Sequence, residues 1–454
     1  MKTLEEIKKR AQSLKGKYIS DLKPTLDTKD KGAIGKIIEE FGFGIKNNSE
    51  SRPDFHDIGL ELKVVPLKTG KKGIKGLSVK ERTKVCFLNY HQILESDWEN
   101  SHAKIKLNHV LFVFYQYNKE NHLDSQIKDY YFFELKNQLD EPIIKCDWKR
   151  TKQLVADGRA HELSESQNKI LAASRSGAGG LDLSKHPTQP NTSIQERAPQ
   201  RSFSLKPSYT NVIWQELNKT KFDTLKSVEH YTSQAGIENF ILGRLQSWHG
   251  KPYNDLLKHF GYTPSNAKNS TATIIRKVLG FTGNKPIKEI EQLGLRVKTI
   301  QCRARDLLPF EAMSFPYQPI GELIEENRFD ESEFYTHLQG FLMIPIYKTF
   351  KKDPNPIIGK AFIYYPEKPT VLKIQKEWEG YRDRAKNLSI VKIPAKNKNG
   401  YERESNLPAK TEIIHMRPHG NDGMDLDKTA PVEITKHCFW FNKGFIQELL
   451  RGNQ

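Results

Sequence analysis

The chain has 454 residues and a formal net charge of +17 at pH 7, because 72 Lys and Arg residues outnumber 55 Asp and Glu residues. This length allows two or three domains with cores of their own, and the charge favours a polyanionic partner such as nucleic acid. No apolar run is long enough to span a bilayer, and residues 1–10 form a charged helical pattern rather than a signal sequence. We therefore expect a cytoplasmic protein without a membrane partner.

Two helices are expected first. Apolar residues recur at helical spacing over residues 2–14, and a second helix is expected after Asp30, a plausible N-cap. The buried stripe of this second helix would consist of Ile34, Ile37, Ile38 and Phe41. Glu39 lies off the centre of that stripe, so the periodicity alone does not direct it toward a neighbouring element.

The next stretch alternates Ile58, Leu60, Leu62 and Val64, which predicts a half-buried strand. Glu61 and Lys63 would share its opposite face, and Asp54 would stand just before the strand. Two carboxylates there could hold a divalent cation, and the lysine could orient a water or neutralise charge on a phosphate. An ordinary edge strand with a solvated polar face is the alternative, because this spacing also occurs by chance.

A lysine-rich stretch follows at residues 68–84 and includes Lys71, Lys72 and Lys75. It is either a solvated loop or, placed beyond a phosphate-cleaving strand, a segment that grips the DNA backbone. Strands are expected at 85–88, 110–117 and 130–135, with helices at 92–94 and 147–156. After a polar loop at 174–201, a strand begins near Phe203 and a helix spans 209–217.

The motif and its surroundings resemble the PD-(D/E)xK motif of the MutH-like endonuclease family. The residues that carry this resemblance are Asp30-Lys31-Gly32, Gly35, Ile37-Ile38-Glu39, Pro53-Asp54, Gly59-Leu60-Glu61-Leu62-Lys63, Ser101-His102, Lys106-Leu107 and Val110-Leu111-Phe112. The resemblance covers roughly residues 2–217 and implies an α/β fold, a mixed β-sheet flanked by helices. It also implies that Asp54 and Glu61 hold Mg²⁺ with help from Glu39, that Lys63 positions the attacking water, and that Lys106 stabilises charge on the phosphate.

In this family the region around 174–201 approaches the DNA grooves. The resemblance therefore makes Arg175, Lys185 and Arg201 candidates for base or phosphate contacts, and Lys206, at the final strand, is a further DNA-binding candidate.

The second half of the sequence repeats the first. Gln12-Ser13 returns as Gln246-Ser247 at an offset of 234, and Leu62-Lys63 returns as Val297-Lys298 at an offset of 235. Phe203 with Tyr209 returns as Phe439 with Phe445 at an offset of 236. One nearly constant offset over two hundred residues predicts two tandem copies of one fold: a catalytic domain at 1–217, a linker at 218–230 and a second domain at 231–454.

The two copies differ at the catalytic positions. Asp54 becomes Glu289, Glu61 becomes Arg296, Glu39 falls opposite Arg276, and Lys106 falls opposite His337. A guanidinium in place of a carboxylate should abolish cation binding, so the second copy is expected to be degenerate. Its Arg276, Arg296 and Lys298 suit phosphate, and Arg417 and His419 lie in a segment that resembles a DNA-approaching part of the family. Each could also be simple surface charge.

An active copy followed by a degenerate one resembles the two-domain Sau-type branch of the family, type II restriction endonucleases that cut at GATC. The resemblance implies Mg²⁺-dependent cleavage of double-stranded DNA, a second domain that binds another copy of the site and promotes dimerisation and cleavage, and a cognate DNA methyltransferase. The alternatives are a strand-nicking mismatch-repair endonuclease, a non-catalytic DNA-binding regulator and an RNA-processing nuclease.

Overall fold

The computed structural model describes residues 3–25, 32–45, 52–69, 76–136, 140–176, 183–192, 196–225, 234–262, 270–283, 285–387, 392–393, 404–405, 407, 411–420 and 425–453. The chain divides into two compact units. Unit 1 comprises residues 1–236 and 285–294, and unit 2 comprises residues 237–284 and 295–454. Among the described helices, none combines the length and the apolar character needed to cross a membrane.

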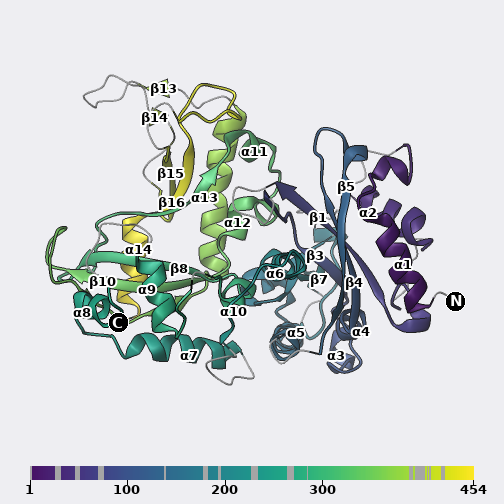
Figure 1. Ribbon diagram of the computed structural model, residues 1–454, viewed down its shortest axis with the longest axis horizontal. Coiled ribbons are helices and arrows are strands. Elements are labelled where there is room, and N and C mark those ends of the chain that lie inside the picture. The colour runs from purple at the N-terminus through teal and green to yellow at the C-terminus, as the bar shows by residue number, and fades with distance from the viewer. Residues whose placement is uncertain are drawn as a thin grey trace. The chain divides into compact units, whose positions relative to one another are not determined.

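Unit 1 contains two sheets with helices packed on them (Figure 1). Its helices are α1 (Leu4–Leu14), α2 (Ala33–Ile37), α3 (Gln92–Glu95), α4 (His102–Leu107), α5 (Asp140–Ala156), α6 (Pro207–Leu217) and α10 (Lys288–Gln292). Its strands are β1 (Glu61–Thr69), β2 (Leu77–Val79), β3 (Thr83–Leu88), β4 (His109–Gln116), β5 (Gln126–Glu134), β6 (Leu171–Arg175) and β7 (Arg201–Leu205).

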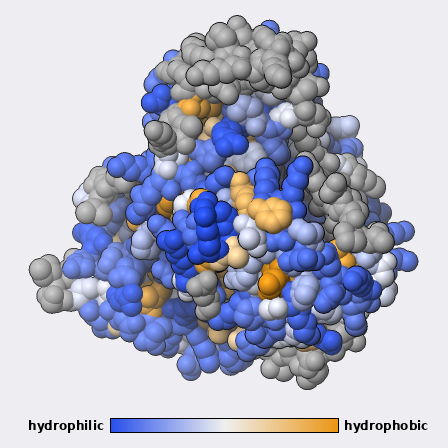
Figure 2. Space-filling view, turned by 90° about the vertical axis from the view of Figure 1, so that its left-hand side faces the viewer, coloured by the Kyte–Doolittle hydropathy of each residue, from blue (hydrophilic) through white to orange (hydrophobic). Residues whose placement is uncertain are grey.

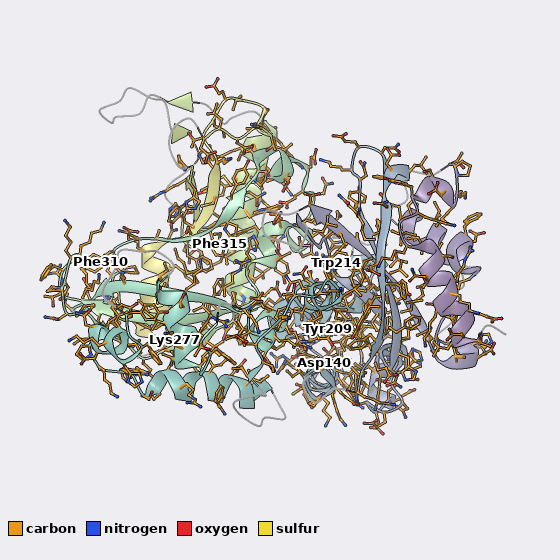
Figure 3. All side chains as sticks on the ribbon, viewed as in Figure 1. Asp140, Tyr209, Trp214, Lys277, Phe310 and Phe315 are labelled. Carbon is orange, nitrogen blue, oxygen red and sulfur yellow. The ribbon has the colours of Figure 1, made fainter. Side chains whose placement is uncertain are left out.

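The larger sheet of unit 1 has the order β2-β1-β4-β5, with β1 parallel to β4 and the other neighbours antiparallel. One face of β4 packs Leu111 and Val113 into a core with α1 and α2. On the other face, the Phe114 ring lies 5.2 Å from that of Trp214 in α6, and Figure 3 shows Trp214 and Tyr209 together on this helix. Because helices cover both faces, β4 is an almost continuous apolar run.

The smaller sheet of unit 1 has the order β3-β7-β6 and is antiparallel throughout. Asp147 of α5 is buried behind it and accepts backbone hydrogen bonds from Lys169, Ile170 and Leu171 at 2.7–3.0 Å. These bonds satisfy a carboxylate that would otherwise be costly to bury, so Asp147 fixes the start of β6 to α5.

Unit 2 has a similar but not identical order of elements. Its helices are α7 (Gln234–Gln246), α8 (Tyr253–His259), α9 (Ser270–Val278), α11 (Ile320–Glu325), α12 (Glu333–Thr336), α13 (Lys368–Lys386) and α14 (Lys443–Arg451). Its strands are β8 (Arg296–Arg303), β9 (Met313–Gln318), β10 (Phe341–Lys348), β11 (Ile357–Ile358), β12 (Phe362–Tyr364), β13 (Lys392–Ile393), β14 (Glu404–Ser405), β15 (Ile414–Pro418) and β16 (His437–Phe441).

The strand pairing of unit 2 follows that of unit 1. β8 is parallel to β10, as β1 is to β4, and β11 and β12 run antiparallel along β10, as β5 does along β4. The order β15-β16-β9 matches β6-β7-β3. The core behind this sheet is aromatic, with the Phe315 ring 5.0 Å from Phe334 and 4.9 Å from Phe441 (Figure 3). The tandem fold predicted from the repeat is therefore visible in both units.

Several predicted boundaries shift in the structure. The strand expected from Ile58 begins at Glu61, because residues His56–Ile58 form a 3-10 helix (η3) that ends at Gly59 with a left-handed φ of 64°. α5 begins at Asp140 rather than Asp147. Asp30 lies outside the described residues, and the N-cap of α2 is Gly32. Part of the loop expected at 174–201 is ordered, since β6 extends to Arg175 and Thr188 pairs with Arg197.

The face of the molecule shown in Figure 2 is mostly hydrophilic, with hydrophobic residues scattered among polar ones.

Candidate active site

The turn before β1 brings Asp54 and Glu61 together. Phe55 and Leu60 exchange backbone hydrogen bonds at 2.9 and 3.3 Å across the short 3-10 helix, so the residues on either side become neighbours. Asp54 N donates to Glu61 Oε2 at 3.3 Å, and Leu62 N donates to Asp54 Oδ2 at 2.9 Å. A left-handed φ favours glycine, so Gly59 allows the turn that closes this pair.

Glu61 is the centre of the site. Its side chain is only 1% exposed, and two lysine ammonium groups contact its oxygens. Lys63 Nζ lies 2.6 Å from Oε1, and Lys106 Nζ lies 3.0 Å from Oε1 and 3.2 Å from Oε2. A buried carboxylate needs such compensation, because removal of one partner of a buried ion pair costs about 3–5 kcal/mol. Lys63 comes from β1 itself and Lys106 from α4.

The position of Lys106 depends on the start of α4. Ser101 is buried and accepts a hydrogen bond from Lys104 N at 3.2 Å, while its hydroxyl donates to the Trp98 carbonyl oxygen at 2.8 Å. Serine is a preferred N-cap because its oxygen satisfies a free helical N–H group. In this way a six-residue helix is held with Lys106 directed at Glu61.

Glu39 also belongs to the site, although helical periodicity did not direct it there. It lies in a π-helical turn, η2 (Ile38–Gly42), that continues α2. Burial raises the pKa of Glu39, and the nearby Asp54 and Glu61 carboxylates raise it further, whereas Lys63 lowers it. A π-turn changes the direction of the side chains that follow it and often occurs at functional sites. For this reason the spacing of a regular helix did not direct Glu39 to the site.

Asp54 responds to the same electrostatics. Burial raises its pKa first, and the Glu61 carboxylate adds to the rise, against the lowering effects of the Leu62 N–H and of Lys63 and Lys106. Like charges close together raise one another's pKa. Asp54, Glu61 and Glu39 therefore form one electrostatically coupled group of carboxylates.

This group suits a hard divalent cation by its donor type, since carboxylate oxygens are the ligands that Mg²⁺ prefers. A cation would also relieve the repulsion that raises the pKa values of Asp54 and Glu39. Within the described part of the chain, no three His, Cys, Asp or Glu side chains are yet gathered as a metal-binding cluster. The assignment of these carboxylates as metal ligands therefore stays a prediction.

The predicted DNA contacts of unit 1 fall into three groups. Lys71, Lys72 and Lys75 lie outside the described residues. Arg175 and Lys185 are exposed, at the end of β6 and in a 3-10 helix.

Arg201 and Lys206 are buried, 7% and 2% exposed, which corrects their prediction as surface contacts. Arg201 Nη1 donates to the Ala173 carbonyl oxygen at 2.8 Å, and burial lowers the pKa of Lys206, which faces Asp147 and Glu165.

In unit 2 the equivalent positions hold a different set of contacts. Arg296 Nη2 contacts His337 Nδ1 in place of the contact between Glu61 and Lys106. Lys298 Nζ donates to the Ser314 carbonyl oxygen at 2.8 Å, and burial, reinforced by Arg296, lowers its pKa to about 8. Arg276 Nε donates to the Gly283 carbonyl oxygen at 2.9 Å. The second site thus presents cations where the first presents carboxylates.

Glu289, the counterpart of Asp54, has a separate role. It belongs to α10, which is part of unit 1, and its buried carboxylate accepts from the Thr224 hydroxyl and from Leu225 N at 2.9 Å. The same helix continues this attachment through Lys288, whose Nζ lies 2.7 Å from Glu216 Oε1. Glu289 therefore holds the segment after α6.

Arg417 and His419 lie beside an aromatic residue that the sequence analysis did not single out. The Arg417 guanidinium lies 5.1 Å from the Trp440 ring centroid, the His419 ring lies 5.4 Å away, and the buried His415 ring is nearly parallel to the indole at 10°. Arg417 and His419 are exposed. Trp440 of β16 pairs directly with His415 of β15. A prediction of this strand pairing from the sequence would therefore have identified Trp440.

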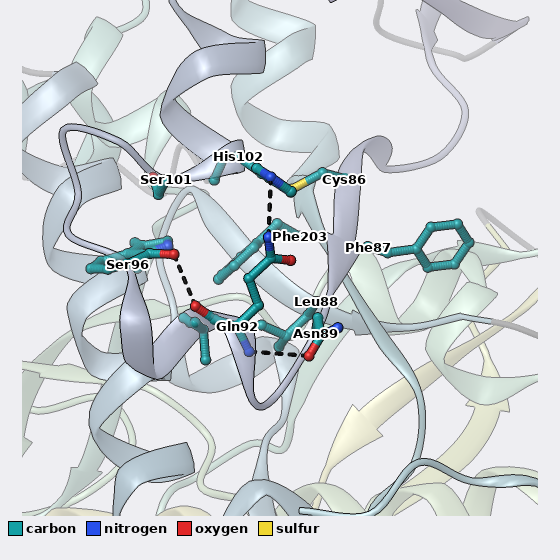
Figure 4. Close-up of a pocket in the computed structure, with 12 residues that line it drawn as sticks. Cys86, Phe87, Leu88, Asn89, Gln92, Ser96, Ser101, His102 and Phe203 are labelled. Atoms are coloured by element: carbon teal, nitrogen blue, oxygen red, sulfur yellow. Dashed lines mark hydrogen bonds between the residues drawn. The ribbon is translucent and has the colours of Figure 1, made fainter. Parts of the chain in front are cut away.

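A pocket lies at the start of α4 (Figure 4). Its lining includes Cys86 and Phe87 of β3, Gln92 of α3 and His102, the first residue of α4. Gln92 Nε2 lies 3.4 Å from His102 Nε2.

Comparisons with known proteins agree with this geometry. Residues 43–147 match the family model described as DNA mismatch repair enzyme MutH. The chain is 29% identical to the type II restriction enzyme Sau3AI of Staphylococcus aureus over 98% of both chains. It is 27% identical to the DNA mismatch repair protein MutH of Vibrio cholerae, over 40% of this chain and 83% of that protein. It is also 27% identical to MutH of Shewanella woodyi, over 47% of this chain and 91% of that protein.

Proposed function

Since the chain belongs to the MutH-like endonuclease family, we propose that it is a type II restriction endonuclease whose first unit hydrolyses phosphodiester bonds of double-stranded DNA. The single observation that carries the proposal is the buried Glu61 carboxylate, held between Lys63 and Lys106 and hydrogen-bonded to Asp54 N. The length favours restriction over repair, because the Sau3AI relative matches 98% of this chain and the two MutH proteins match 40% and 47% of it.

Asp54, Glu61 and Glu39 would hold Mg²⁺, which as a bound cation supplies Lewis-acid stabilisation of the phosphate and lowers the pKa of water. Lys63 Nζ, 2.6 Å from Glu61 Oε1, would orient the attacking water. Lys106 is placed on the other side of the same carboxylate and would donate to the phosphate oxygens as negative charge develops on them.

The second unit would bind DNA without cutting it. Arg296 and His337 occupy the register positions of Glu61 and Lys106, and a fixed guanidinium charge suits a phosphate while opposing a metal ion. Exposed Arg417 and His419 beside Trp440 add a second group of DNA-binding side chains. We propose that this unit binds another copy of the recognition site, GATC, and that this binding promotes dimerisation and cleavage by unit 1.

With one catalytic site per chain, a double-strand break at a symmetric site requires either two chains on that site or two sequential nicks, and dimerisation would provide the first route. A restriction enzyme of this kind also requires a cognate DNA methyltransferase, which would protect the host's own sites.

The test uses the whole protein, supercoiled plasmid that contains GATC and a matched plasmid in which every GATC has been changed. With Mg²⁺ we expect linear products from the first plasmid only, and none when the metal is chelated. Addition of a short GATC duplex should accelerate cleavage. Cleavage of both plasmids would contradict the proposal that GATC is the recognition site.

The alternatives give different results when the same assay also includes an RNA substrate. Nicked circles that never become linear would favour the mismatch-repair nickase. Specific DNA binding with no cleavage in any divalent cation would favour a non-catalytic regulator, and cleavage of RNA in place of duplex DNA would favour an RNA-processing nuclease.

A further inference from the structure

Phe87 of β3 is a large apolar side chain in an unusual position. Its side chain is 57% exposed, the greatest exposure among the large hydrophobic residues of the described chain, followed by Phe350 at 56%. A single exposed aromatic residue on a protein surface needs no explanation by itself. The surroundings of Phe87, however, connect it to the active site.

A β-bulge places Lys84 beside Phe87. In the pairing of β3 with β7, Lys84 is opposite Ser204 and Cys86 is opposite Phe203, so one extra residue lies between them. Without the bulge, residues three apart would point to opposite faces of the strand. Here Lys84 and Phe87 are both exposed, and Lys84 Nζ lies 3.2 Å from the centre of the Phe87 ring.

The pair lies close to the catalytic carboxylates. β3 contacts β1, the strand that carries Glu61 and Lys63. Phe87 borders the pocket that reaches His102, which is four residues before Lys106 in α4, or about 6 Å along a helix. Since base pairs are stacked about 3.4 Å apart, DNA whose phosphate reaches Lys106 would present the adjacent nucleotides to β3. Figure 4 shows the Phe87 ring extending away from Gln92 and His102.

Unit 2 has the bulge but lacks the exposed pair. β9 carries the same register shift against β16, so Ser314 corresponds to Lys84 and Tyr317 to Phe87. The carbonyl oxygen of Ser314 accepts from Lys298, and the Tyr317 hydroxyl is hydrogen-bonded to Asp427 and Thr429. The bulge therefore belongs to the duplicated fold. In unit 2 the cation over the corresponding ring comes from outside the strand, since Lys436 Nζ lies 5.7 Å from the Tyr317 ring centroid, whereas in unit 1 the bulge itself brings Lys84 to Phe87.

We propose that Lys84 and Phe87 form a DNA-positioning pair next to the scissile phosphate, an inference that rests on the proposed nuclease function of unit 1. Lys84 binds a phosphate that neighbours the cut, and its ammonium leaves the aromatic ring to do so. Phe87 then inserts against the adjacent base step and partly unstacks it, as apolar wedges do in other DNA-bending proteins. The unstacked step fixes the scissile phosphate over Glu61 and Lys106.

The experiment compares Phe87→Ala and Phe87→Trp with the matched control Phe350→Ala, in the whole protein and with an oligonucleotide duplex. Single-turnover cleavage should fall about 10- to 100-fold for Phe87→Ala, because small errors in position at a reacting centre have effects of this size. Phe87→Trp and Phe350→Ala should retain the wild-type rate. Lys84→Ala should reduce the slope of log affinity against log salt concentration by about one, the value expected for the loss of one phosphate contact.

A second readout reports the geometry directly. With 2-aminopurine beside the scissile phosphate, binding by a Glu61→Gln protein should raise the fluorescence, and Phe87→Ala in the same background should remove this rise. A Phe87→Ala protein with the wild-type cleavage rate and the wild-type fluorescence rise would overturn the inference. So would a Phe87→Ala protein in which only the oligomeric state changes, because Phe87 would then lie in an interface between two copies of the chain. If the wild-type protein binds the duplex but never cleaves it, the proposed function fails; the fluorescence comparison still decides whether Phe87 unstacks the step.

Discussion

Glu61 and Arg296 occupy the same register position in the parallel strand pairs of the two units. Each is the first residue of a strand that pairs in parallel with the next long strand, Glu61 opposite Val110 and Arg296 opposite Phe341. Each also contacts the residue four positions before that partner, Lys106 in unit 1 and His337 in unit 2. The two copies therefore share this strand pairing and differ by a carboxylate in one and a guanidinium in the other, which is the basis for proposing that unit 1 cleaves DNA and unit 2 only binds it.

Asp54→Asn should stabilise the metal-free protein near neutral pH. The pKa of Asp54 is higher in the folded protein than in the unfolded chain. The folded protein therefore holds the Asp54 proton more tightly. As the pH rises through the unfolded and then the folded pKa, ionisation of Asp54 lowers the free energy of unfolding. Asparagine keeps an oxygen for Leu62 N and removes the charge. We expect a rise in Tm of about 2 °C near neutral pH and no rise well below the carboxyl range. Added Mg²⁺ should raise Tm for the wild type only. A lower Tm for Asp54→Asn at every pH would contradict this electrostatic account.

Lys106→Met should lower kcat about 100-fold with little change in KM, since it removes a charge that acts on the developing phosphate charge. Lys104→Met is the matched control: it lies in the same helix, and its ammonium pairs with Glu99 and Glu141, away from Glu61. Steady-state cleavage of a duplex, with Tm measured for both variants, makes the comparison. Equal losses of activity would show that α4 was disturbed as a whole.

Glu289→Ala should destabilise unit 1 by about 1–3 kcal/mol, because it leaves the buried Leu225 N–H without its acceptor. Chemical denaturation can measure this. Glu291→Ala, at an exposed position of the same helix, should change stability by less than about 0.5 kcal/mol. Equal stability of the two variants would mean that α10 does not hold the segment after α6.

Arg417→Ala should weaken binding of a cleavage-inactive protein to duplex DNA and reduce the slope of log affinity against log salt by about one contact. Arg384→Ala, at an exposed position of α13 in the same unit, provides the control. An unchanged salt slope for Arg417→Ala would remove the β15 segment from the proposed DNA-binding surface.

The sequence predicted the parts of this site that local patterns encode. Asp54, Glu61 and Lys63 follow from a short motif on a strand, and the second copy of the fold follows from a repeat with a nearly constant offset. Glu39 did not follow, because a π-turn breaks the 3.6-residue period on which such predictions depend. Lys84 and Phe87 did not follow either, since a β-bulge reverses the alternation of the strand.

The burial of charged side chains was the other feature that the sequence did not predict. Arg201 was a candidate DNA contact because the family resemblance brings its region to the DNA grooves, and Lys206, at the final strand, was a further candidate. The structure places them against Asp147, Glu165 and a backbone carbonyl oxygen, partners that come from distant parts of the sequence. Glu289 likewise changed its surroundings because α10 packs in unit 1, which no local pattern records.

The most direct test of the central claim compares single-turnover cleavage by Glu61→Gln and Arg296→Gln at saturating enzyme. The account predicts that Glu61→Gln binds duplex DNA normally and cleaves it at least about 1000-fold more slowly, whereas Arg296→Gln, once bound, cleaves within about tenfold of the wild-type rate. Cleavage by Glu61→Gln near the wild-type rate, or abolition of cleavage by Arg296→Gln with Glu61 intact, would contradict it.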